Sequence, residues 1–101
     1  LKIAYNILDS DSNTPNGIYT QIYKAVIRYI NLKTGANKVE YSTGEIIEII
    51  KSYNKNEVYH KIEQILIRGE AVRFAPISSQ DARNDLRLIK KLLKKIDGSW
   101  L

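Results

Sequence analysis

The chain has 101 residues, a length that fits one domain with a single buried core. Apolar residues make up 44% and charged residues 27%, which are globular values and exclude bulk disorder. The absence of cysteine excludes disulfides, thiolate metal ligands and thiol nucleophiles, and it suits a reducing compartment. Because no apolar run approaches the ~18 residues of a membrane span and no secretory leader is recognisable, we expect a soluble chain. Because methionine is also absent, we expect a piece of a longer protein.

The first thirteen residues predict a short element followed by a linker. Residues 1–7 alternate loosely between apolar and polar, as in a short strand or in the tail of a preceding helix. The polar run at 9–13 is typical of turns and predicts a linker. We therefore place a single helical domain at 14–101.

A long helix is predicted after this linker. Thr14 offers a capping hydroxyl, Pro15 suits the first helical position, and Gly35 is a typical helix stop. Apolar residues recur between them at a four-residue step, which predicts one face packed against a core. These residues are Ile18, Tyr19, Ile22, Tyr23, Val26, Ile27 and Ile30. A polar connector follows, in which 39–41 could add a short extended segment.

Residues 42–76 predict a helix, a tight turn, a second helix and an extended run. Ser42 and Glu45 have the spacing of a capping box, and isoleucines dominate the helix that they open. The second helix is predicted to stop at Gly69. The run at 71–75 alternates and predicts an extended segment.

The last helix is predicted from a Ser/Asp cap at 78–81 to Gly98, with apolar residues at alternating four- and three-residue steps. Trp100 follows it and is free either to fold back onto the core or to meet a partner. The other face of this helix is basic, which indicates a solvated surface first and, as alternatives, a surface for anionic lipid headgroups or nucleic acid. The basic residues are Arg83, Arg87, Lys90, Lys91, Lys94 and Lys95.

Catalytic chemistry finds no support in the residues. His60 is the only histidine, so neither a zinc site nor a serine–histidine pair can be completed in a convincing way. The five glycines are isolated and form no phosphate-binding loop. We predict that the domain is not an enzyme and needs no cofactor or metal.

The order of elements in 42–76 is also that of a winged helix, in which the second helix enters the major groove of DNA. Lys55, Lys61 and Arg68 would then face the DNA. However, residues 42–69 carry four basic and four acidic side chains, and phosphate contacts dominate DNA affinity. DNA binding by a transcriptional regulator is therefore the alternative and not the first prediction.

Several short motifs together resemble a known family. They are the Ile- and Tyr-rich helix at 22–30, Thr43 and Glu45 at the start of the next helix, and Arg73-Phe74-Ala75-Pro76 before the last helix. Over roughly residues 16–97 this order resembles the small C-terminal cytoplasmic domain of unknown function in certain prokaryotic membrane proteins. Those proteins accompany transglutaminase-like, MoxR ATPase or von Willebrand factor A modules, and BatD-like proteins end in a similar way.

The resemblance implies a non-catalytic module for assembly or regulation, tethered to the cytoplasmic face of the membrane by upstream helices. No catalytic residues are established in that family, so none is carried over. We predict a mainly all-α domain of four helices, with a minor β element at 39–41 and 71–75 left open. We expect a protein partner to contact Arg73 and Phe74 first, and Trp100 and the basic helix face next.

Overall fold

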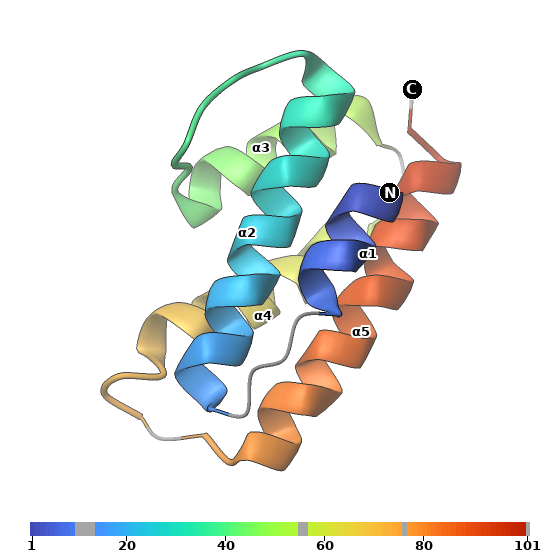
Figure 1. Cartoon of the computed structure of the whole chain (residues 1–101). Helices are drawn as coiled ribbons and strands as arrows, with labels where there is room; N and C mark the ends of the chain where they lie inside the picture. Colours follow the sequence, from blue (N-terminus) through green and yellow to red (C-terminus); the bar gives the residue numbers. More distant parts are fainter. Residues whose placement is uncertain (10–13, 55–56, 76, 101) are drawn as a thin grey trace.

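Five helices make up most of the chain in the computed structural model, which describes residues 1–9, 14–54, 57–75 and 77–100 (Figure 1). The two longest helices, α2 and α5, run along the length of the molecule, and α1 lies against both of them. α3 and α4 cover the other side of α2. The helices are α1 (Lys2–Leu8), α2 (Pro15–Thr34), α3 (Thr43–Tyr53), α4 (Tyr59–Ala71) and α5 (Ser79–Gly98). The all-α prediction is confirmed.

Three of the helices begin at the side-chain caps that the sequence predicts. The hydroxyls of Thr14, Ser42 and Ser78 each accept a hydrogen bond at 3.0 to 3.1 Å from the backbone N–H three residues further on. The Glu45 carboxylate in turn accepts a hydrogen bond from the backbone N–H of Ser42 at 3.0 Å, which completes the capping box. Gly35 ends α2 in the left-handed region, with φ of 74°.

The minor β element that the sequence leaves open does not form in the described residues, which contain no strand and only an isolated bridge between Asn54 and Trp100. Residues 39–41 belong to the connector between α2 and α3. The run at 71–75 is not extended, because the carbonyl of Ala71 accepts hydrogen bonds from Phe74 and Ala75 at 2.9 and 2.8 Å. Residues 72–75 therefore form a turn, and within the described ranges no strand follows α4 as the wing of the winged-helix alternative would require.

The prediction of four helices is wrong, because the described residues form five: residues 2–8, for which the sequence left a short strand or the tail of a helix open, are helical. Ala4 and Leu8, one helical turn apart, are buried against the core. The hydroxyl of Tyr5 donates to the carbonyl of Lys90 in α5 at 2.8 Å, and the ammonium of Lys90 pairs with Asp9. α1 thus contributes to the same core as α2 and α5. Residues 10–13 of the predicted linker lie outside the described residues.

Trp100 folds back onto the domain, which was one of its two predicted positions. Its ring stacks on Tyr53 with the centroids 5.3 Å apart and meets the edge of Tyr29 at 5.8 Å. Tyr29 is fully buried, and its hydroxyl donates to Asp97 at 2.8 Å. Trp100 therefore closes one end of the core.

Candidate functional site

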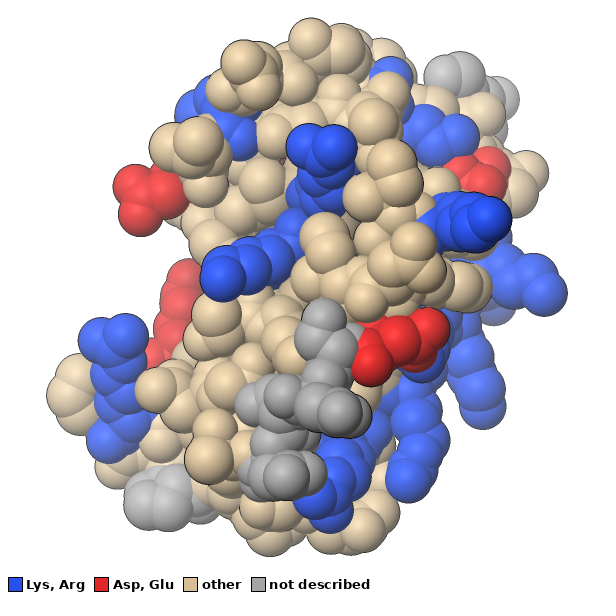
Figure 2. Space-filling view, viewed as in Figure 1, with Lys and Arg blue, Asp and Glu red and all other residues tan. Residues whose placement is uncertain are grey.

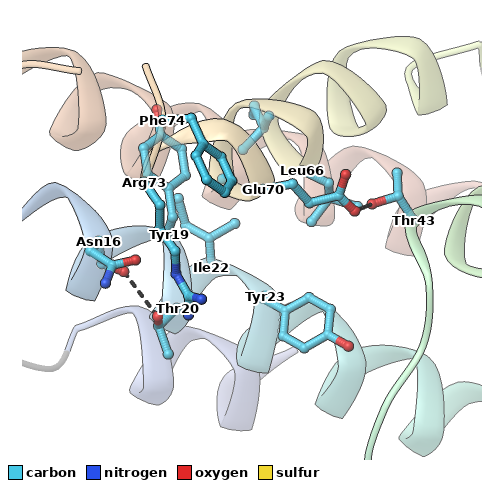
Figure 3. A pocket seen from close by; sticks show the side chains of 12 residues that line it. Asn16, Tyr19, Thr20, Ile22, Tyr23, Thr43, Leu66, Glu70, Arg73 and Phe74 are labelled. Atoms are coloured by element: carbon cyan, nitrogen blue, oxygen red, sulfur yellow. Dashed lines mark hydrogen bonds between the residues drawn. The ribbon is translucent and has the colours of Figure 1, made fainter. Parts of the chain in front are cut away.

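A hollow of about 310 Å³ opens between α2, α4 and the start of α3 (Figure 3). Its floor is apolar, with Ile22, Ile65 and Leu66. Arg73 and Phe74, in the turn after α4, stand on its rim, and the Arg73 side chain extends across the hollow toward Thr20. Two residues that the sequence singles out as contact groups are thus brought to one depression.

Phe74 is the most unusual side chain of this rim, because it is 87% exposed. A phenyl ring left in water forgoes the ~1.5–3 kcal/mol that burial of such a side chain contributes. The turn that presents it is held by the hydrogen bonds to the carbonyl of Ala71. The Phe74 ring is therefore held in contact with solvent by a hydrogen-bonded turn.

The closeness of α4 to α2 shapes one wall of the hollow. Gly69 was predicted to stop the helix, but α4 continues past it to Ala71. A Cβ atom at Gly69 would lie 3.3 Å from the Cβ and Cδ1 atoms of Tyr19, which is tighter than ordinary packing. Gly69 therefore allows the two helices to approach each other.

A buried polar network beside this contact joins α2, α4 and α5. The carboxylate of Asp85 accepts hydrogen bonds from the Tyr19 hydroxyl at 2.5 Å and from the Arg68 guanidinium at 2.8 and 2.7 Å. Burial and the hydrogen bond to Asp85 raise the pKa of Tyr19 to about 12. The same carboxylate raises the pKa of Arg68. The network fixes Tyr19, which lines the hollow.

A second hollow, of about 510 Å³, lies along α2 between the end of α1 and the connector to α3. Thr20 and Tyr23 line both hollows. Tyr23 is fixed to the connector, since its hydroxyl donates to the carbonyl of Tyr41 at 2.7 Å and accepts from the Tyr41 N–H at 3.0 Å. Val39, on the far rim, is 89% exposed. Sequence reasoning missed this hollow because its walls meet only in the folded chain.

Two polar contacts order the start of α3 beside the hollows. Thr43 donates to Glu70 at 2.6 Å, and Lys38 pairs with Glu45 at 2.7 Å. The Lys38 ammonium and the Ser42 groups lower the pKa of Glu45 to about 2, and Glu45 raises the pKa of Lys38. These contacts tie the connector and α4 to the first turn of α3.

The basic residues of the last helix lie together on α5, and Figure 2 shows Lys and Arg side chains gathered on the side that α5 occupies in Figure 1. Lys90 is engaged in holding α1, and Arg83 is half-buried. Within the described part of the chain, the exposed residues of this face that make no ion pair are Arg87, Lys91, Lys94 and Lys95. We call these four residues the basic stripe. None of them lines either hollow.

The structure describes two of the three residues that the DNA-binding alternative assigns to the DNA. Arg68 forms an ion pair with Asp85, and Lys61 is exposed on α4. Lys55 lies outside the described residues. Since the described chain also contains no strand that could form a wing, the winged-helix interpretation keeps only the order of α3 and α4, and DNA binding stays a prediction.

His60 is exposed at the start of α4, with its ring centroid 4.3 Å from that of Tyr59. No group of three acidic or histidine side chains in the described ranges converges as a metal site requires. None of the helices described combines the length and apolar character needed to cross a membrane.

Comparisons with known protein families, curated proteins and solved structures find no match for this chain. The family resemblance therefore stays a prediction.

Proposed function

We propose that this domain is a non-catalytic protein-interaction module whose partner docks at the hollow beside Arg73 and Phe74. The observation that carries the proposal is the Phe74 ring, 87% exposed on the rim of an apolar hollow. Aromatic and arginine side chains dominate the affinity of protein interfaces when they surround a small apolar pocket. The partner covers Phe74 and places an apolar side chain on the floor.

Charge supports a partner that brings a carboxylate to this rim. Arg73 is exposed and makes no ion pair with another described residue, whereas Glu70 on the opposite rim is bonded to Thr43. An acidic group beside the apolar anchor would satisfy the guanidinium with a two-pronged hydrogen bond. An apolar anchor followed by Asp or Glu is therefore the partner chemistry that we propose.

The family resemblance supports a setting for this module in the cytoplasmic part of a larger, membrane-associated protein. In that setting the module would link the membrane protein to a cytoplasmic partner. This part of the proposal depends on the resemblance and not on the hollow.

Affinity capture with the purified domain, followed by mass spectrometry, tests the proposal. We compare the wild type with Phe74→Ser, Arg73→Ala and the control Ile67→Ser, a half-exposed apolar position that lines neither hollow. A protein partner should be retained by the wild type and by the control, and reduced about tenfold by Phe74→Ser. An identical set of captured proteins for all four baits, with folding verified by circular dichroism, would refute the proposal.

A further inference from the structure

The two hollows adjoin on α2, because Thr20 and Tyr23 line both of them; the α2 lining runs from Asn16 to Tyr23 in the first hollow and from Thr20 to Asn31 in the second. We infer that together they form one docking groove for an acidic amphipathic helix of the partner, an inference that rests on the proposed function. The helix lies along α2, with one apolar side chain in each hollow and carboxylates toward Arg73, Lys24 and Arg28.

The length of the groove suits a helix of about four turns. Its α2 wall extends from Asn16 to Asn31, which at 1.5 Å per residue is about 22 Å. Exposed apolar side chains stand on the rims of its two halves, Phe74 on one and Val39 on the other. Tyr23, held by two hydrogen bonds to Tyr41, forms a fixed ridge between the halves. A single side chain cannot fill both halves, so the occupant needs two separated anchors.

The walls favour a helix over an extended segment. An extended peptide gains its affinity from backbone hydrogen bonds to the edge of a sheet, and the described residues contain no strand. The groove is walled instead by helices and by the connector to α3. A helical occupant satisfies its own backbone N–H and C=O groups and needs only apolar contacts and rim charges.

The charges of the lining favour an acidic occupant. Four basic and two acidic side chains line the two hollows. Glu70 is already bonded to Thr43, and Lys38 to Glu45. Lys24, Arg28 and Arg73 are exposed and form no ion pair within the described chain, and the same holds for one acidic lining residue, Glu40. Because these three cations outnumber that one acid, the lining favours an incoming carboxylate.

Selection from a random library of displayed 16-residue peptides tests the inference without knowledge of the natural partner. As helices, such peptides are about 24 Å long. The enriched peptides should carry apolar residues spaced by three and four, with Asp or Glu beside them and a negative net charge. They should become helical on binding, as measured by circular dichroism. The double variant Lys24→Glu/Arg28→Glu should lower the affinity of the domain for these peptides about tenfold, as expected when charges on the rim are reversed. Phe74→Ser should lower it by a similar factor, as expected when an aromatic anchor is lost.

The matched control is Lys91→Glu/Lys94→Glu, which changes the net charge equally on the basic stripe and should leave peptide binding unchanged. The inference would be overturned by enriched peptides whose apolar residues alternate with period two or whose net charge is positive. It would also be overturned if the peptides bound the Lys24→Glu/Arg28→Glu variant as tightly as the wild type, or if the library yielded no peptide sensitive to Phe74→Ser. The proposed function is tested separately by affinity capture: if Phe74→Ser still reduces capture of a protein partner about tenfold while the peptide selection fails, the interaction module stands and only its helical, acidic ligand is rejected.

Discussion

Asp85 shows how one residue can organise the wall of the candidate site. It is 8% exposed and lies on α5, between the buried Ala82 and Ile89 on the apolar side of that helix. Its partners, Tyr19 and Arg68, come from two other helices. A carboxylate at such a position would be costly without them, so the three residues act as a unit.

We expect Asp85→Ala to lower the free energy of unfolding by roughly 2 kcal/mol, because the Tyr19 hydroxyl and the Arg68 guanidinium lose their acceptor. The Arg68 side chain is 41% exposed, so water recovers part of the cost of breaking a fully buried pair. Urea unfolding followed by the fluorescence of Trp100, the only tryptophan, measures the change. Tyr19→Phe keeps the ion pair and should cost about 1 kcal/mol. Equal losses in the two variants would contradict a network centred on Asp85.

Glu45 makes the stability of the domain sensitive to acid. Its pKa is lowered from 4.5 to about 2, first by Lys38 and then by Ser42. Because the pKa in the folded state lies below that of the unfolded chain, the ionised group stabilises the fold above about pH 4.5. That contribution is lost as the pH falls toward about 2.

We therefore expect the stability of the wild type relative to Glu45→Gln to be positive at neutral pH and to shrink between about pH 5 and pH 2. Glutamine can keep the reciprocal geometry of the capping box, so the comparison isolates the charge. Denaturant unfolding at a series of pH values measures it. In a Lys38→Gln background the loss should occur at higher pH, and a difference that does not depend on pH would contradict the assignment.

The caps could be predicted from the sequence because a cap involves residues only three apart, as Ser42 and Glu45 are. Asp85 could not be paired, because Tyr19 and Arg68 lie 66 and 17 residues away. The available signal was its place on the apolar side of the last helix, since a carboxylate there requires a buried partner. The DNA-binding alternative places Arg68 at the DNA for the same reason, because the sequence does not show that Asp85 is its ion-pair partner.

At the level of the helices, Gly69 shows that a glycine can mark close packing as well as a helix end. We expect Gly69→Ala to give no net stabilisation, because the new Cβ would lie 3.3 Å from Tyr19, which the hydroxyl bond to Asp85 holds in place. Gly98 in α5 has no neighbouring heavy atom within 4 Å of such a Cβ, so Gly98→Ala should gain roughly 0.5 kcal/mol. Thermal unfolding of both variants checks the prediction. A comparable gain at Gly69 would show that α4 and α2 have room to move apart.

The sequence does not decide between helix and strand for α1, because seven residues are too few to distinguish a helical spacing of apolar residues from an alternating one. Its helical form depends on contacts with α2 and α5, which lie far along the chain. We expect Leu8→Ala, at a position 1% exposed, to cost about 2–4 kcal/mol. Ile3→Ala, at a position 42% exposed on the same helix, should cost well under half as much. Equal small effects in chemical unfolding would instead place the start of the domain at residue 14.

On the scale of the whole molecule, basic side chains that form no ion pair with another described residue stand on two surfaces: Lys24, Arg28 and Arg73 beside the groove along α2, and the basic stripe on α5. The sequence predicted that the last helix carries a basic face but not that Lys90 would be used to hold α1. It also could not predict the groove, whose walls come from α1, α2, the connector, the start of α3, α4 and the turn after α4.

The basic stripe leads to a prediction that is independent of the groove. Arg87, Lys91, Lys94 and Lys95 should each contribute about 1 kcal/mol to binding at an anionic bilayer surface. We expect co-sedimentation with vesicles of phosphatidylglycerol and phosphatidylcholine at low salt, none with phosphatidylcholine alone, and release as salt shortens the Debye length. Lys91→Glu/Lys94→Glu should weaken this binding by more than about tenfold, whereas Lys24→Glu/Arg28→Glu, with the same net charge, should weaken it much less. Equal losses in the two variants would show that only the net charge of the domain matters, and the stripe would then be an ordinary solvated face.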